Sequence, residues 1–191
     1  MNYLLENSLD LSTKQYGFVK GRSTMLQLLH MVDKWTECLE QGGQIDSIYS
    51  DFEKAFDKVP HKRLISKLHA YGLRDSIIRW IKNFLSARKY RVKVNLSSSR
   101  WCDVTSGIPQ GSVLGPLLFL IYINDLVECC GEYADIYVFA DDAKFFRHIL
   151  QPQDQDMLQH ALNLLHNWSQ KWLLNLNINK CQVMSILWKT Y

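Results

Sequence analysis

The stretch that decides the fold is Phe139-Ala140-Asp141-Asp142, which places two adjacent carboxylates between the apolar run Ile136–Ala140 and the half-apolar run Ala143–Ile149. Aromatic and β-branched residues favour a pleated, half-buried surface, so the two runs predict a β-hairpin with the acids at its tip. Like charges a few ångströms apart raise each other's pKa or attract a cation, which points to chemistry at this tip. Taken alone, an Asp-Asp pair is better explained as a solvated turn, so the chemical interpretation needs support from the rest of the sequence.

Composition sets limits on the class of protein. The chain has 191 residues, 47% of them hydrophobic, which fits one domain or a compact pair of subdomains with a substantial core. A net charge of +3 means that a polyanionic partner must be met by local basic patches. Five cysteines without a CxxC pair or zinc-finger spacing indicate reduced thiols, as in a cytosolic or nuclear protein.

Nothing in the sequence predicts secretion or a membrane span. The N-terminus lacks a basic segment followed by an apolar one, so we expect no signal peptide. The longest apolar run, Val113–Ile123, is far shorter than the roughly 20 residues that cross a bilayer. The expected location is the nucleus or the cytoplasm.

The remaining pattern mixes helices and strands. Helical spacing of apolar residues, with Ser, Pro and Gly at the ends, predicts helices over 24–39, 60–72, 75–85, 116–127 and 152–172. Strands are expected over 44–52 and 181–187, and a second hairpin from 90–94 and 100–105. Because two hairpins imply antiparallel pairing and strict βαβ alternation is absent, the predicted class is α+β, in one continuous unit.

Asp51 is the expected partner of the acidic hairpin. It lies near the end of the strand over 44–52, 90 residues before Asp141. Carboxylates brought together from distant segments onto neighbouring strands would form a hard-oxygen site suited to Mg²⁺, which shares its other positions with water and phosphate. Such a site suits in-line phosphoryl chemistry with two metal ions.

Five ordered blocks, covering nearly the whole chain, resemble the reverse transcriptases of non-LTR retrotransposons, the jockey-like branch especially. Motifs A and C resemble Tyr49-Ser50-Asp51-Phe52-Glu53-Lys54-Ala55-Phe56-Asp57 and Phe139-Ala140-Asp141-Asp142. Motif B resembles Gly107-Ile108-Pro109-Gln110-Gly111-Ser112-Val113-Leu114-Gly115-Pro116. A first fingers block resembles residues 15–24, and motif D resembles residues 172–181. The resemblance implies a right-hand polymerase fold with fingers and palm, and RNA-directed DNA synthesis.

The resemblance also implies ligands and catalytic residues. Asp51 and Asp141, with the backbone carbonyl of Phe52, would hold two Mg²⁺ or Mn²⁺ ions. Asp142 would ligate or adjust the site from the side, because neighbouring strand residues point to opposite faces. Lys180 matches the motif D lysine, a general acid for the leaving pyrophosphate, although a lone Lys there is as often a solvated surface residue.

Other residues are expected to bind the nucleotide or the nucleic acid. Phe56 aligns with the steric gate that rejects a ribose 2′-hydroxyl, with a core ring as the alternative. Gln110 would contact the incoming nucleotide, and Lys20 and Arg22 a phosphate. Basic residues interleaved with Tyr90 would follow a nucleic-acid backbone, or else protect an exposed hairpin edge; they are Arg88, Lys89, Arg91 and Lys93.

Two interpretations of the whole chain follow from the resemblance. The chain is expected to be a truncated reverse transcriptase domain over 1–191, with 12–43 and 60–106 as fingers or fingers–palm elements and 44–59 and 107–191 as palm. Its expected partners are an RNA template, a DNA primer, deoxynucleotides, and a missing C-terminal thumb or flanking domains of a longer polyprotein. The alternative is a non-catalytic retroelement relic that at most binds nucleic acid.

Overall fold

A computed structural model describes residues 11–187 of the chain. The chain divides into two compact units, and each is described by itself. The first, which we call the hairpin unit, contains Lys54–Tyr122. The second, the sheet unit, contains Leu11–Glu53 and the chain from Ile123 onward.

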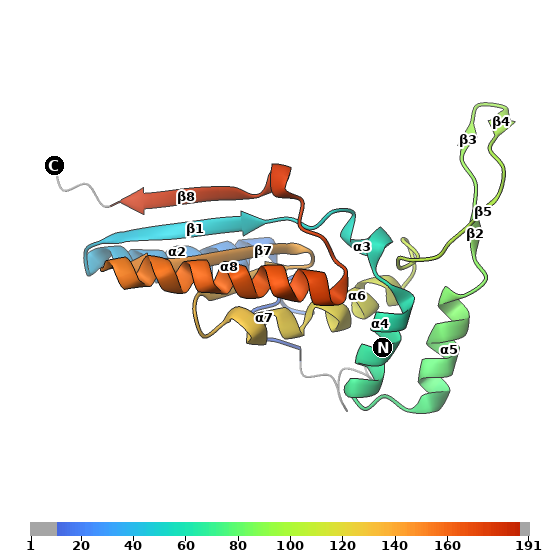
Figure 1. The fold of residues 1–191 in the computed structure, drawn as a ribbon, viewed down its shortest axis with the longest axis horizontal. Coiled ribbons are helices and arrows are strands. Elements are labelled where there is room, and N and C mark those ends of the chain that lie inside the picture. The colour runs from blue at the N-terminus through green and yellow to red at the C-terminus, as the bar shows by residue number, and fades with distance from the viewer. Residues whose placement is uncertain (1–10, 188–191) are drawn as a thin grey trace. The chain divides into compact units, whose positions relative to one another are not determined.

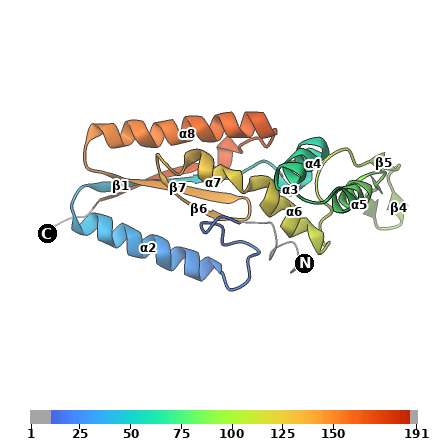
Figure 2. The ribbon, with the colours of Figure 1, turned by 90° about the horizontal axis from the view of Figure 1, so that it is seen from below.

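The sheet unit is built on a four-stranded antiparallel sheet with the order β6-β7-β1-β8. Figure 1 shows β8, β1 and β7 of this sheet. Helix α2 covers one face of this sheet and the long helix α8 covers the other (Figure 2). The elements are α2 (Thr24–Glu40), β1 (Gln44–Ser50), α7 (Asp125–Cys130), β6 (Asp135–Phe139), β7 (Asp142–Ile149), α8 (Pro152–Trp172), the 3₁₀ turn η1 (Ile178–Lys180) and β8 (Gln182–Leu187). The predicted α+β class with antiparallel pairing is confirmed.

Two consecutive phenylalanines in β7 explain why both faces of the sheet are covered. Phe145 and Phe146 are fully buried, although neighbouring strand residues point to opposite faces. Phe146 meets Trp35 of α2 edge to face, with ring centroids 5.7 Å apart. On α8 the buried stripe is Leu158, Ala161, Leu165 and Trp168. A strand that is apolar on both sides therefore requires a helix on each side.

Local chemistry sets the ends of the two covering helices. The side chain of Ser23 accepts the backbone N–H of Leu26 at 3.1 Å and so caps the start of α2. Helix α8 begins with a capping box between Gln151 and Asp154, with Pro152 in its first turn. It ends at Leu173, whose φ of 55° lies in the left-handed region.

The hairpin unit consists of short helices and an exposed two-part hairpin. Its elements are α3 (Ala55–Lys58), α4 (His61–Ala70), α5 (Asp75–Leu85), β2 (Lys89–Tyr90), β3 (Lys93–Val94), β4 (Ser97–Ser98), β5 (Cys102–Asp103) and α6 (Leu114–Ile123). Strand β2 pairs with β5, and β3 pairs with β4. Residues 117–123 of α6 are all buried, as expected for a helix without a polar face.

The structure departs from the sequence-based prediction in four places. The helix expected over 116–127 is two helices, α6 and α7, and Asn124 between them uses its side-chain oxygen to accept the backbone N–H of Ser12 at 2.9 Å. The hairpin expected from 90–94 and 100–105 is shortened to two-residue ladders, joined where Ser99 and Val92 exchange hydrogen bonds. Helix α3 and the turn η1 were not predicted.

Within residues 11–187 no helix combines the length and the apolar character needed to cross a membrane.

Asp154 is expected to contribute to stability in a pH-dependent way. Burial raises the pKa of Asp154, but the N–H groups of Leu150 and Gln151 and the guanidinium of Arg147 outweigh it, and the net shift is downward. A lowered pKa means that this stability is present above the pKa of about 4 in the unfolded chain and is lost as the pH falls through the folded value.

We therefore expect Asp154→Ala to lower the free energy of unfolding by about 1–2 kcal/mol at pH 7. Urea unfolding followed by circular dichroism at pH 7 and pH 3 measures the effect, and the deficit should shrink at pH 3. Asp156→Ala, an exposed position on the same helix, is the control and should change stability by less than about 0.5 kcal/mol. Equal losses at both pH values would contradict the assigned role of the carboxylate.

Candidate active site

The acidic hairpin closes with a two-residue turn. In the β6–β7 register Phe139 pairs with Asp142, so Ala140 and Asp141 are the turn residues. Ala140 has a φ of 54°, in the left-handed region, which costs a residue with a Cβ about 1–2 kcal/mol. The turn that presents Asp141 is therefore strained and must be held by its surroundings.

Strand pairing brings Asp51 to this turn. Ser50 at the end of β1 lies opposite Ala143 of β7, so Asp51, the next residue, leaves the sheet at the end that carries the acidic turn. The side chain of Ser50 adds a buried hydrogen bond to the carbonyl of Ala143 at 3.1 Å. The expected approach of two segments 90 residues apart is thus produced by β1–β7 pairing.

The three carboxylates share one electrostatic environment. Burial raises the pKa of Asp141, and the charges of Asp142 and Asp51 raise it further, against the opposing effects of its own backbone N–H and of Lys180. Burial and then the charge of Asp51 raise the pKa of Asp142, while Lys144 and Lys180 oppose the shift. The negative charge concentrated here disfavours ionisation, which is the condition under which a bound cation gains most.

Asp51 is held from the segment that follows α8. The Nζ of Lys180 lies 3.2 Å from Oδ2 of Asp51, and the side-chain amide of Asn177 donates to the same oxygen at 3.4 Å. The backbone N–H of Asn177 also donates to the carbonyl of Asp51 at 2.8 Å. The structure therefore brings Lys180 to the aspartates. Asn177 was missed by the sequence analysis, and its position three residues before Lys180 was the available clue.

Phe52 holds the segment that follows α8 in place beside the end of β1. It forms an isolated antiparallel bridge with Leu176, its ring is buried, and the centroid lies 5.9 Å from that of Trp168 on α8. Glu53 donates its N–H to the carbonyl of Asn175 at 2.8 Å, on the other side of the bridge. The ligand role expected of the Phe52 carbonyl stays a prediction.

The donor set fits Mg²⁺ or Mn²⁺. Carboxylate oxygens are the ligands that these hard cations prefer, and Mg²⁺ commonly uses one or two of them and keeps several waters. Burial raises the pKa of Asp141 and of Asp142, and the negative charges of neighbouring aspartates raise it further; a bound cation would favour the charged form of both groups. Among residues 11–187 no group of three or more His, Cys, Asp or Glu side chains is arranged to hold a metal ion, so water and substrate oxygens would have to supply further ligands.

Lys20 and Arg22, expected to hold a phosphate, differ in their surroundings. Lys20 is exposed. Arg22 is half-buried, and its Nη1 donates to the backbone carbonyls of Ser12, Thr13 and Gln15, the first two at 3.2 and 2.7 Å. The phosphate role stays a prediction for both, and for Arg22 the structure adds a contact that orders the chain before α2.

In the hairpin unit, Phe56 and Gln110 lie on connected segments. Phe56 is half-buried and stacks on the buried ring of Phe119 of α6, with centroids 4.2 Å apart. Gln110 is exposed, and its side-chain amide donates to Asp57 at 2.9 Å. The stacking makes Phe56 part of the packing of this unit while part of the ring stays exposed, so both interpretations offered by the sequence remain.

The loop that carries Gln110 is tied to α3 and its surroundings. Gly107 has a φ of 87°, and a Cβ there would lie 2.5 Å from the carbonyl oxygen of Asp57, so only glycine fits. The backbone N–H of Ile108 donates to the carbonyl of Phe56 at 2.8 Å, and the side chain of Ser106 donates to the carbonyl of Asp57 at 3.0 Å. Asp57, not singled out by the sequence analysis, is thus a common anchor for this loop.

The basic residues of the hairpin are exposed, and two of them share a cavity with Gln110. This cavity of about 660 Å³ is lined on one side by Arg88, Lys89 and Tyr90 and on the other by the loop over 103–110 with Lys54 and Asp57. Lys89 lies 3.5 Å from Asp103. Arg91 lies over the exposed ring of Trp101, 4.7 Å from its centroid, a pair that the sequence analysis did not anticipate.

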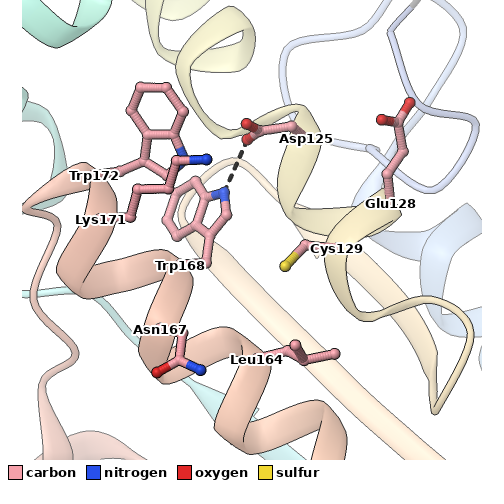
Figure 3. A pocket seen from close by; sticks show the side chains of 8 residues that line it. All are labelled: Asp125, Glu128, Cys129, Leu164, Asn167, Trp168, Lys171 and Trp172. Carbon is pink, nitrogen blue, oxygen red and sulfur yellow. Dashed lines mark hydrogen bonds between the residues drawn. The ribbon is translucent and has the colours of Figure 1, made fainter.

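A separate pocket of about 420 Å³ lies between α7 and α8 (Figure 3). The indole N–H of Trp168 donates to Asp125 across it at 2.9 Å. The residues that line it are Asp125, Glu128, Cys129, Leu164, Asn167, Trp168, Lys171 and Trp172. None of the predicted site residues lines this pocket. The Asp125–Trp168 hydrogen bond joins α7 to α8, so the pocket lies where these two helices pack.

Comparison with known proteins finds a family and a fold. The family model for "Reverse transcriptase (RNA-dependent DNA polymerase)" matches residues 1–190. A probable RNA-directed DNA polymerase from transposon BS of Drosophila melanogaster is 29% identical over 98% of this chain, and the RNA-directed DNA polymerase from mobile element jockey of Drosophila funebris is 32% identical over 87%. This chain spans 22% and 19% of the length of these two relatives.

Solved structures of telomerase share the fold. A telomerase of Candida tropicalis in complex with a fragment of telomeric RNA matches 96% of this chain and 32% of its own length, with a TM-score of 0.70 at 12% identity. An apo telomerase of the same organism, truncated from its C-terminal domain, matches 93% of this chain and 37% of its own, with a TM-score of 0.68 at 13% identity. The likeness confirms the predicted right-hand α+β class.

Removing one charge from the acidic site is expected to stabilise the protein. Asp141→Asn relieves the repulsion among the three carboxylates, so we expect the free energy of unfolding at pH 7 to rise by about 1 kcal/mol. Added Mg²⁺ should raise the thermal unfolding midpoint of the wild type and not that of the variant, because a ligand stabilises only the state that binds it. Asp33→Asn, an exposed position on α2, is the control. A variant less stable than the wild type without Mg²⁺ would contradict the repulsion.

Proposed function

The chain belongs to the reverse transcriptase (RNA-dependent DNA polymerase) family, and we propose that Asp51, Asp141 and Asp142 form its site for template-directed nucleotidyl transfer. The resemblance to non-LTR retrotransposon enzymes expected from the sequence is confirmed by the relatives. The observation that carries the proposal is the strand pairing that ends with Ser50 opposite Ala143 and Phe139 opposite Asp142, and so brings the end of β1 to the acidic turn, with Lys180 paired to Asp51. For the whole protein we propose RNA-directed DNA synthesis as in a mobile element.

The aspartates would hold the divalent cations. Asp51, Asp141 and the carbonyl of Phe52 are the proposed ligands of two Mg²⁺ or Mn²⁺ ions, and Asp142 adds negative charge or a further ligand. When bound, the ions would activate the primer 3′-hydroxyl and neutralise charge on the triphosphate. Without them, burial and the charges of neighbouring aspartates raise the pKa of Asp141 and of Asp142, which supports a cation as the natural occupant.

Lys180 would serve as the proton donor to the leaving pyrophosphate. Its side chain is 69% exposed, so it can reach a substrate, while the ion pair with Asp51 keeps the ammonium beside the carboxylates. Asn177 would keep Asp51 oriented when Lys180 turns to the substrate, because its amide and its backbone N–H both bind Asp51.

Phe56 and Gln110 would select and hold the incoming nucleotide. Stacking on the buried Phe119 limits the movement of the Phe56 ring, which a steric gate against a 2′-hydroxyl requires. Gln110 is oriented by its hydrogen bond to Asp57 and is carried by a loop anchored to α3. Lys20 and Arg22 would contribute positive charge to a phosphate.

The exposed hairpin formed by β2 to β5 in the hairpin unit would bind the nucleic acid, an RNA template paired to a DNA primer. Arg88, Lys89, Arg91 and Lys93 are exposed on two short ladders and would contact backbone phosphates. Tyr90 and Trp101, with exposed rings, would stack on bases. Arg88 and Lys89 line the same cavity as Gln110, which supports a common role in substrate binding.

Primer extension tests the enzymatic proposal. Because this chain spans about a fifth of its curated relatives, we would measure it alone and as a chimera that replaces the corresponding segment of the jockey polymerase. We expect the chimera to extend a DNA primer on an RNA template with deoxynucleotides and Mg²⁺, and Asp141→Asn to reduce the rate by a factor of about 10³ or more, since it removes a proposed ligand.

Two outcomes would sink the proposal. One is an inactive chimera beside an active jockey parent, and the other is an Asp141→Asn chimera that matches the wild type. Retained binding of primer-template without extension would favour the non-catalytic interpretation. Asp33→Asn in the chimera is the control and should extend normally.

The gate assigned to Phe56 predicts a change in sugar selection. In the chimera we expect Phe56→Ala to increase incorporation of ribonucleotides relative to deoxynucleotides by about tenfold or more, because the ring that meets the 2′-hydroxyl is removed. Phe56→Tyr keeps the ring and should keep the discrimination. The ratio of kcat/KM for the two sugars measures the effect. An unchanged ratio in a folded Phe56→Ala protein would assign Phe56 to the core packing with Phe119.

A further inference from the structure

The turn that presents Asp141 depends on a glutamine 125 residues away in sequence. Gln15 is 3% exposed, and its side-chain oxygen accepts the backbone N–H of Ala140 at 2.9 Å. The same oxygen accepts the N–H of Gly17 at 2.7 Å. Ala140 is the strained residue of the turn, so this hydrogen bond acts where the backbone most needs support.

The segment around Gln15 is paired with the strand that leads to the turn. Gln15 forms a parallel bridge with Val138 of β6. The N–H of Tyr16 donates to the carbonyl of Val138 at 2.8 Å, and the N–H of Val138 donates to the carbonyl of Lys14 at 2.9 Å. Residues 14–16 thus extend the sheet beyond the β6 edge and bring the Gln15 side chain to the end of β6.

Gly17 lets this segment touch the turn. A Cβ at Gly17 would lie 2.4 Å from the backbone nitrogen of Ala140, 3.0 Å from its Cα and 3.1 Å from its Cβ. The φ of Gly17 is not in the left-handed region, so the glycine is needed here for space alone. The segment and the turn therefore pack backbone against backbone.

Arg22 holds the other side of the same segment. Its guanidinium donates to the carbonyls of Ser12, Thr13 and Gln15, and it lies 5.4 Å from the ring centroid of Tyr16. The planar guanidinium can bind several carbonyls at once, which a lysine ammonium does less well. The path from Arg22 through Gln15 to Ala140 is continuous and lies within the sheet unit.

We propose that Gln15, held in place by Arg22, is a positioning residue that fixes the Ala140–Asp141 turn and so aims the Asp141 carboxylate for metal binding. Without the Gln15 oxygen, the buried N–H of Ala140 would lose its partner, at a cost comparable to the strain of the turn itself. The turn would then relax, and Asp141 would leave its place beside Asp51. This inference rests on the proposed metal site at Asp51 and Asp141.

The test is a Mn²⁺ titration of the full ¹⁵N-labelled chain, followed by nuclear magnetic resonance. Mn²⁺ broadens the amide signals near its site, and the midpoint of broadening at Asp51 and Asp141 gives the affinity. Hydrogen exchange of the Ala140 amide, measured in the same samples before Mn²⁺ is added, reports the hydrogen bond to Gln15. The variants are Gln15→Met, which removes the acceptor at similar volume, and Gln15→Glu, which keeps an acceptor oxygen.

Gln27→Met is the matched control. Gln27 is a fully buried glutamine of α2 in the same unit, and neither its side-chain oxygen nor its nitrogen has a hydrogen-bond partner among the described residues. Its replacement tests whether loss of any buried amide from this unit affects metal binding. We expect the control to leave the Mn²⁺ midpoint and the Ala140 exchange rate unchanged.

We expect Gln15→Met to raise the Mn²⁺ midpoint about tenfold and to speed exchange at Ala140 by about tenfold or more, with Gln15→Glu close to the wild type. A folded Gln15→Met protein with a wild-type midpoint would overturn the inference, as would an equal shift in Gln27→Met. Where Gln15→Met does not fold, Gly17→Ala decides, since it displaces Ala140 and leaves Gln15 intact; a raised midpoint supports the inference and an unchanged one overturns it.

Failure of the proposed function has a different signature. If Mn²⁺ broadens no signal at Asp51 or Asp141 in the wild type, or if Asp141→Asn binds Mn²⁺ as the wild type does, the proposed metal site is wrong. If that site is present and depends on Asp141, only the response of the Gln15 and Gly17 variants bears on the positioning role.

Discussion

The antiparallel pairing of β1 with β7 is the constraint on which the rest of the sheet unit depends. Its register sets Ser50 against Ala143, so that the strand carrying Asp51 ends beside the turn carrying Asp141. A shift by one residue would move every side chain of β7 to the other face and separate the acids. Phe145 and Phe146 oppose such a shift, because both are buried and each packs on a different face.

The acidic site is maintained against its own electrostatics. Burial and mutual repulsion raise the pKa of Asp141 and of Asp142, and the turn between the strands contains an alanine in the left-handed region. Strain and repulsion of this kind persist only where surrounding contacts outweigh them. Here the contacts come from Gln15 on one side of the turn and from Lys180 and Asn177 at Asp51. Binding of the proposed metal ion would replace repulsion among the carboxylates with attraction to the ion. A site that lowers stability when empty is a common compromise between stability and function.

The residues of the motifs that resemble reverse transcriptases divide into two groups: those proposed to contact substrate and those that hold the backbone. In the first block Gln15, Gly17 and Arg22 support the hairpin turn, and in the motif B block Gly107 is required by its approach to Asp57. Gln110 is exposed and bonded to Asp57, which suits a substrate contact. A motif shared with a family therefore contains both residues suited to contact substrate and residues that support the backbone. The hydrogen bonds of each residue in the structure distinguish these two roles.

The sequence by itself determined the α+β class, the main helices and the acidic hairpin, because these depend on local periodicity, caps and turn residues such as Ser23 and Pro152. Through the resemblance to a family it also predicted the three aspartates and Lys180 as site residues. Only the tertiary structure decided that Asn177 binds Asp51, that Gln15 holds Ala140, and that Arg22 binds backbone carbonyls. These contacts join residues up to 126 positions apart, and a side-chain hydrogen bond to a distant backbone leaves no periodic trace in the sequence.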